Sequence, residues 1–407
     1  MSSLILFSKQ FLRPNHVING SLKWMPSLTQ SVINGIHKRY LFTNEVLGIN
    51  GYLETRNRIS QQFGQLREKF FTRMEEFATS ESKMIFTEDL KNIVFMTDNN
   101  DQELRLLTDA IKKFHSQNQT LQFGTFVFGP IVMRLLHHLS EWQLALQLFK
   151  DPELRGFFSQ IKSAVILMNL LLTNGKYDEC MDVFDYIHNE ITFEIRYPRD
   201  CLLLYVAAAY KLNTEEAYNR VLETLKKSRE VGAPVSRKTV CLFAGLALNQ
   251  NQPNTALEVL SLITQSNYIT VKNLRLQALS DLDRFDDLFI TLRVMLNRDM
   301  PSQTNRGELV EETFNRIKAK IESKNDEKLS LEWSQIERGL SEGQFITNTP
   351  LKDLLLSPVV LRENLTPNDR QQFERQRGYR NPTIQRNFRR EQQQRPQPER
   401  RAFNEEF

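Results

Sequence analysis

The sequence of 407 residues is poor in cysteine and contains no long apolar run. Its three cysteines (Cys180, Cys201 and Cys241) are odd in number and far apart, and they lie in apolar helical patterns. This arrangement argues against a disulfide framework and predicts small core residues in a reducing compartment. No stretch approaches the roughly 18 apolar residues of a membrane-spanning helix, so no membrane insertion is expected.

The motifs of common catalytic sites are also missing. The sequence has no GxxxxGK[ST] nucleotide loop and no HExxH, CxxC or GxSxG motif. His137 and His138 have no partner at metal-ligand spacing, which favours a turn or a helix end over a zinc site. We therefore expect no enzyme, no cofactor and no metal, although catalytic groups from distant parts of the chain could converge without a motif.

Acidic residues are absent from the first 40 residues, which carry Lys9, Arg13, Lys23, Lys38 and Arg39. A basic, Ser-rich and acid-free arm is typical of a mitochondrial presequence, whereas its apolar run is too short for a secretory signal. Residues 1–40 are thus predicted to be a targeting presequence that is cleaved near Arg39 and Tyr40.

The remaining chain is dominated by pairs of helices. Residues 163–187 predict an apolar helix, a turn at Asn174 and Gly175, and an amphipathic helix with a small residue, Cys180, in its first turn. The equivalent positions elsewhere are Leu107, Ala145, Ala217, Ala256 and Leu288, which gives spacings of 38, 35, 37, 39 and 32 residues. One helical hairpin per 30 to 45 residues indicates a repeat solenoid rather than an irregular bundle.

The predicted fold is all-α: a right-handed α-solenoid of about six degenerate hairpins over residues 41–300. Residues 52–77 suggest one long helix before the hairpins, and residues 97–101 suggest a turn. Asn213, Asn249 and Asn251 are expected at turns, as Gly175 is. Residues 301–367 are predicted to form a C-terminal helical cap, and the Arg/Gln-rich residues 368–407 a disordered tail.

Charge is distributed unevenly along the chain. The arm has five basic residues, and the tail has ten Arg against six acids. The body between them (residues 41–367) has 38 basic and 43 acidic residues. A nucleic-acid surface on the body would therefore need a local stripe of cations rather than overall charge.

Several short segments carry a resemblance: RYLFTNEVL (residues 39–47), FGPIVMRL (128–135), LRGFFS (154–159), YKLN (210–213) and LALNQN (246–251). Together with hairpins of about 35 residues and a Gly turn, they make the chain resemble animal mitochondrial pentatricopeptide repeat proteins. The resemblance implies a protein of the mitochondrial matrix that binds single-stranded mitochondrial RNA without catalysis. It further implies a role in RNA maturation, with RNA-processing proteins as further partners. Through RNA maturation, the protein would support respiratory-chain function.

In such proteins a residue early in each first helix helps to read a base. Counting back fifteen positions from each small residue gives Pro130, Val165, Leu202, Cys241 and Asn273. Only Asn273 has a side chain that can pair with a base edge, so the one-base-per-repeat code is mostly absent.

Three residues before those positions, three consecutive repeats carry Lys162, Arg199 and Lys238. Stacked hairpins would place these residues side by side as a basic stripe on the concave face, one cation for each phosphate of a single strand. Ordinary solvated charge at helix starts is the competing interpretation. The alternative function is a protein–protein scaffold in a mitochondrial ribosome or RNA-processing complex.

Overall fold

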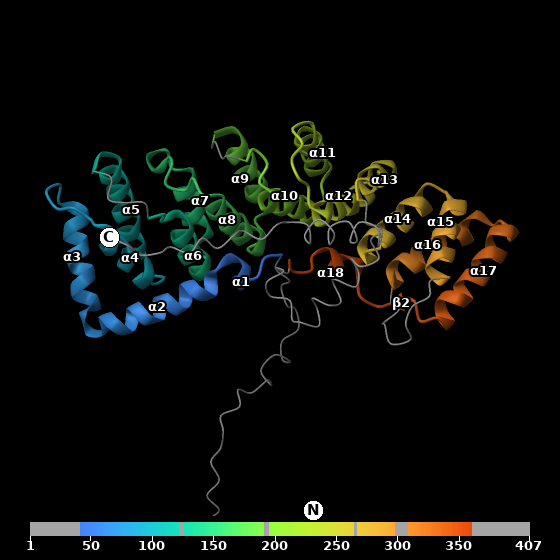
Figure 1. The fold of residues 1–407 in the computed structure, drawn as a ribbon, viewed down its shortest axis with the longest axis horizontal. Coiled ribbons are helices and arrows are strands. Elements are labelled where there is room, and N and C mark those ends of the chain that lie inside the picture. Colours follow the sequence, from blue (N-terminus) through green and yellow to red (C-terminus); the bar gives the residue numbers. More distant parts are fainter. Residues whose placement is uncertain (1–40, 122–125, 191–194, 264–266, 298–307, 360–407) are drawn as a thin grey trace, which may run out of the picture. The chain divides into compact units, whose positions relative to one another are not determined.

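The structure is a computed structural model that describes residues 41–121, 126–190, 195–263, 267–297 and 308–359, all within one compact unit. Helical hairpins follow one another along it in the order that the small residues predict (Figure 1). The hairpins are α4 (Thr87–Met96) with α5 (Asp101–Leu121), α6 (Gly129–Leu139) with α7 (Trp142–Lys150), α8 (Ile161–Thr173) with α9 (Tyr177–Glu190), α10 (Arg199–Leu212) with α11 (Glu215–Glu230), α12 (Arg237–Asn249) with α13 (Pro253–Ser261), and α14 (Ile269–Asp281) with α15 (Phe285–Leu296). A short 3-10 helix, η2 (Pro152–Leu154), follows α7.

The six equivalent positions that the sequence predicted (Leu107, Ala145, Cys180, Ala217, Ala256 and Leu288) lie in the core. All six residues lie in second helices and are fully buried, and the Cys180 thiol donates to the Met168 carbonyl of the facing helix at 3.5 Å. Each first helix, from α4 to α14, also packs against the first helix of the next hairpin. The chain is therefore an all-α solenoid, as the sequence predicted.

First helices in the middle of the row are buried nearly all round. Every residue from Ser163 to Leu171 of α8 is buried, and so is every residue from Cys201 to Ala209 of α10. These helices have neighbours on both sides and a partner helix behind, which explains why they are apolar on every face. Cys180, Cys201 and Cys241 are free and buried, as expected.

Left-handed residues form the predicted turns. Gly175, Asn213 and Asn251 have φ angles of 74°, 54° and 53°. The prediction for Asn249 is wrong, because this residue is the last helical residue of α12 and the turn is made two residues later. Residues 97–100 join α4 to α5, as predicted.

A further hairpin, α16 (Glu311–Lys324) with α17 (Glu327–Glu342), stacks on α14 and α15. It is bracketed by β1 (Leu309–Val310) and β2 (Ile346–Thr347), which pair in parallel with Leu309 opposite Ile346. The short helix α18 (Leu351–Leu355) then runs back along the first-helix row and packs on α12 and α14.

The long helix expected over residues 52–77 is instead two helices, α2 (Ile49–Phe63) and α3 (Arg67–Thr79), preceded by α1 (Asn44–Leu47). The break falls at Gly64, which has a φ of 44° and opens the short helix η1 (Gly64–Leu66). Gly64 can adopt this angle without strain, so the helix can turn there and let α2 pack on α4 while α3 packs on α5.

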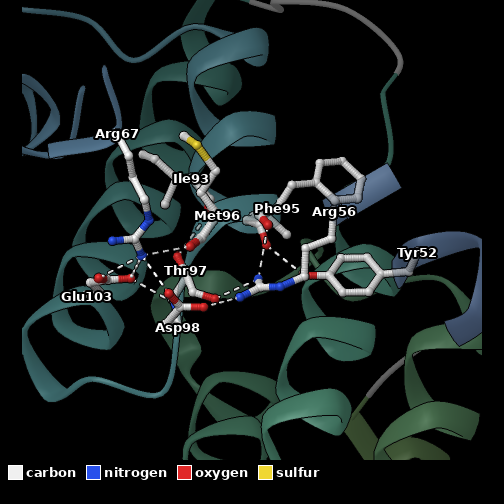
Figure 2. Close-up of polar contacts among 10 residues, drawn as sticks. Tyr52, Arg56, Arg67, Ile93, Phe95, Met96, Thr97, Asp98 and Glu103 are labelled. Carbon is white, nitrogen blue, oxygen red and sulfur yellow. Dashed lines mark hydrogen bonds and ion pairs between the residues drawn. The ribbon is translucent and has the colours of Figure 1, made fainter. Parts of the chain in front are cut away.

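Two arginines fasten these helices to the end of α4 (Figure 2). Arg56 of α2 donates to the carbonyl oxygens of Phe95 and Thr97 and pairs with Asp98. Arg67 of α3 donates to the Met96 carbonyl at 3.0 Å and pairs with Asp98 and Glu103. These contacts satisfy carbonyl groups that the helix end leaves without intrahelical partners. None of the described helices is long and apolar enough to cross a membrane.

Candidate nucleic-acid interface

Three cations of the predicted stripe begin three consecutive first helices. Lys162 is the second residue of α8, Arg199 is the first of α10 and Lys238 is the second of α12. Because α8 packs on α10 and α10 on α12, the three positions lie on neighbouring helices of one row. We call the surface of this row of first helices, on which these cations lie, the first-helix face.

Lys162 and a fourth cation, Arg134 of α6, hold the same short segment. The Lys162 Nζ donates to the Val46 carbonyl at 2.8 Å, and the Arg134 Nε donates to the Leu47 carbonyl at 3.0 Å. Both side chains are half-buried, and burial lowers the pKa of each. Both acceptors lie in α1, near the N-terminal end of the described chain.

Lys238 holds a segment from the other end of the described chain. Its Nζ donates to the Ser357 carbonyl and, at 3.1 Å, to the Ser357 hydroxyl. Burial lowers the pKa of Lys238 to about 8. Arg199, between these two covered cations along the row, is exposed.

No carboxylate forms an ion pair with Arg134, Lys162, Arg199 or Lys238 among the residues that the structure describes. Other cations of the same chain do have such partners: Lys272 pairs with Glu308. Their present partners are neutral, because a carbonyl oxygen orients a cation without neutralising it, so a negatively charged ligand could still add electrostatic stabilisation.

Asn273 has a structural role in the fold. It is fully buried, its Nδ2 donates to the carbonyls of Ile269 at 2.7 Å and Glu308 at 2.9 Å, and its Oδ1 accepts from the Val310 N–H at 2.8 Å. All of its hydrogen-bonding groups are occupied, and they fix β1 against α14. Pairing with a base would require these hydrogen bonds to break. RNA contact by Asn273 therefore stays a prediction, and the structure offers no free hydrogen-bonding group on this side chain that would support it.

The side chains at the other base-reading positions are also buried, wholly or in part. Val165, Leu202 and Cys241 are buried, and Pro130 is half-buried in α6. A face built this way can hold a strand through its phosphates, but it presents no donor and acceptor pattern to the bases at these positions.

Sequence reasoning missed Arg134. The available signal was a single cation inside the apolar helix GPIVMRLLHHL, where an unpaired charge is costly and needs an acceptor. Its partner, Leu47, is 87 residues away in sequence, so only the fold could supply it. Gly48, with a φ of 74°, ends α1 and lets the Arg134 guanidinium approach the backbone.

His137 and His138 lie in the last turn of α6, as expected of a helix end. Within the described ranges, no three His, Cys, Asp or Glu side chains gather as a metal-binding group. Arg39 and Tyr40 of the predicted cleavage region lie outside the described residues, as do the arm and the tail.

The stacked hairpins define a class, the all-α helical-repeat solenoids. Within that class, the chain is similar to vertebrate proteins that carry the name "Pentatricopeptide repeat-containing protein 2, mitochondrial". The Mus musculus protein is 28% identical over 285 residues, covering 70% of this chain and 73% of the mouse protein. The Homo sapiens protein is 27% identical, covering 70% of this chain and 72% of its own length. The Danio rerio protein is 27% identical over 319 residues, 78% of this chain and 81% of its own length.

The resemblance to animal pentatricopeptide repeat proteins is thereby confirmed. No family model matches the chain, and no solved structure does. The identity with these relatives is low, and the matches cover 70 to 78% of this chain.

Proposed function

We propose that this chain is a non-catalytic RNA-binding protein of the mitochondrial matrix that supports the maturation of mitochondrial transcripts and thereby respiratory-chain function. The observation that carries the proposal is a set of cations on the first-helix face that form no ion pair with a carboxylate of the described residues (Arg134, Lys162, Arg199 and Lys238). The similarity to proteins whose names contain "pentatricopeptide repeat" and "mitochondrial" supports it.

Phosphate is the ligand that fits these cations best. A cation binds an anionic oxygen more strongly than a neutral carbonyl oxygen because the two charges attract, and here the acceptors of Arg134, Lys162 and Lys238 are neutral carbonyls. Successive phosphates of a single strand would meet a cation on α6, α8, α10 and α12. Since the base-reading positions are closed, binding is expected to depend weakly on sequence.

The test replaces the three cations of the predicted stripe by glutamine, as Lys162→Gln, Arg199→Gln and Lys238→Gln in one protein. Glutamine keeps a donor for the carbonyls, so the fold should survive. Each lost phosphate contact removes about 0.7 from the slope of log affinity against log salt, so the slope should flatten by about 2. The loss should be similar for RNAs of different sequence.

The matched control carries Lys226→Gln, Lys227→Gln and Arg229→Gln on α11, a second helix. It removes the same charge from exposed positions away from the first-helix face. Its salt slope should stay that of the wild type. An unchanged slope in the folded stripe variant would contradict the proposal, and RNA crosslinking in intact mitochondria would name the transcripts bound.

A protein scaffold in a mitochondrial ribosome or RNA-processing complex is the second candidate. The closed base-reading positions favour it, because an RNA reader would leave Val165, Leu202 and Asn273 free. This function predicts stable co-purification with protein partners and no crosslinked RNA.

A further inference from the structure

The two ends of the described chain meet on the first-helix face. The Val359 N–H donates to the Leu41 carbonyl at 2.8 Å, joining residues that are more than 300 positions apart. We call residues 41–48 and 351–359 together the clasp. Figure 1 shows its helices, α1 and α18, beside the row of first helices, on the side away from α7, α9, α11 and α13.

Apolar burial holds the clasp in place. Leu41 and Phe42 are 1% and 3% exposed, and Leu355 and Leu356 are 2% and 6% exposed. All four belong to the same core cluster as α8, α10 and α12. The clasp is therefore a packed part of the fold rather than a loose strand lying on it.

The clasp also accepts hydrogen bonds from cations of this face. Arg134 and Lys162 donate to carbonyls of its N-terminal part, and Lys238 donates to Ser357 in its C-terminal part. These carbonyls occupy the positions that phosphate oxygens would need. Only Arg199, on α10, is left exposed among the four.

We propose that the clasp is an autoinhibitory cover that must open before single-stranded RNA can bind all four cations. The inference rests on the proposed function, since it assumes that these cations bind phosphate. In the closed state a strand can contact Arg199 alone. When the clasp opens, its neutral carbonyls are exchanged for anionic oxygens, and Arg134, Lys162 and Lys238 gain partners of opposite charge.

A reversible lock tests this directly. Leu41→Cys and Val359→Cys place two thiols at residues already joined by a main-chain hydrogen bond of 2.8 Å. Loss of free thiols on oxidation shows that the disulfide has formed. Oxidation should hold the clasp closed, and reduction should release it in the same protein. Salt slopes are measured with a fluorescent single-stranded RNA in both states, and thermal melting shows that both are folded.

The oxidised protein should have a slope smaller by about 2, because three contacts of about 0.7 each are withheld. Its affinity at 0.1 M salt should be at least roughly tenfold weaker than that of the reduced protein. The wild type with and without reductant is the control, since its three cysteines are buried.

A second variant opens the clasp without new thiols. Leu355→Ser with Leu356→Ser removes two buried apolar anchors and changes no charge. RNA should therefore bind more tightly than to wild type, with the same salt slope, because the bound strand contacts the same four cations. Leu262→Ser with Leu331→Ser makes the same exchange at residues 41% and 64% exposed, and should bind like wild type.

The outcomes separate the two proposals. If RNA binds equally well to the locked and unlocked proteins, and the serine variant gains nothing, the clasp is not a cover and the RNA-binding proposal stands. If RNA binds to none of these proteins, including wild type, the proposed function fails and the cover fails with it.

Discussion

At the scale of single residues, the partners of the buried cations are the most informative feature. Lys238 is half-buried against a carbonyl, and burial lowers its pKa to about 8. A negative partner would raise that pKa again, because an opposite charge nearby favours the charged form. The neutral partner therefore leaves an electrostatic gain that an anionic ligand can still provide.

His137 is a second buried group whose ionisation matters. Its Nε2 lies 3.1 Å from the Asn169 Nδ2 on α8, and burial lowers its pKa to about 4 from an ordinary value of 6.5. Desolvation disfavours the charged ring inside the fold, and the neighbouring His138 adds to this effect.

Stability should consequently depend on pH through His137. Below pH 6.5 the unfolded chain binds a proton that the folded chain does not take up until about pH 4. The contribution is present above pH 6.5 and is lost as the pH falls toward 4. Between pH 7 and pH 5, wild type should lose about 2 kcal/mol more than a His137→Gln variant. Urea unfolding at both pH values measures this, and equal losses would contradict it.

At the scale of elements, the junction of α6 with α8 depends on a glycine. A Cβ added at Gly129, the first residue of α6, would lie 2.8 Å from the Phe157 carbonyl and 2.8 Å from the Ser163 hydroxyl. Because one of these atoms is backbone, it cannot move aside as the end of a side chain could. The close approach lets consecutive first helices pack without a gap.

Gly129→Ala should therefore destabilise the protein by roughly 1–3 kcal/mol through overpacking. Gly51→Ala is the matched control: Gly51 lies inside α2, and no atom of the described residues lies within 4 Å of an added Cβ. Alanine is the better helix former there and should stabilise by roughly 0.5–1 kcal/mol. Denaturant unfolding of both variants measures the two opposite changes in the free energy of unfolding. An unchanged free energy of unfolding in Gly129→Ala would show that the junction can relax.

At the scale of the whole molecule, the predicted cleavage of the arm falls next to the clasp. The acid-free arm predicts cleavage near Arg39 and Tyr40, and the residues that follow, Leu41 and Phe42, are buried. Cleavage at the predicted place would leave the clasp intact. Cleavage a few residues later would remove two core side chains and the bond to Val359.

The mature protein from mitochondria should accordingly begin within a residue or two of Tyr40, as N-terminal sequencing would show. A version that begins at residue 44 should be less stable than one that begins at residue 41 by roughly 3–6 kcal/mol, the burial of two large apolar side chains. A mature protein starting at Met1 or Ser2, or equal stability of the two versions, would contradict this prediction.

Local patterns predicted the hairpins because each signal lies within one repeat. The small residues of the second helices and the left-handed turns at Gly175, Asn213 and Asn251 needed only neighbouring sequence. The local pattern was less reliable where a helix-breaking residue lay within an amphipathic pattern. Gly64 ended a helix that the amphipathic pattern would have continued. The cations of the stripe were placed on the correct helices, but their partners were not foreseen.

The sequence by itself determined the repeat, because helix periodicity, small contact residues and turn residues act over three or four positions. Only the tertiary structure decided what the first-helix face meets. Arg134 and Lys162 bind carbonyls 87 and 116 residues away, and Lys238 binds one 119 residues away. A backbone carbonyl is present at every residue, so no side chain in the sequence marks it as a partner, and only folding brings that oxygen to the cation.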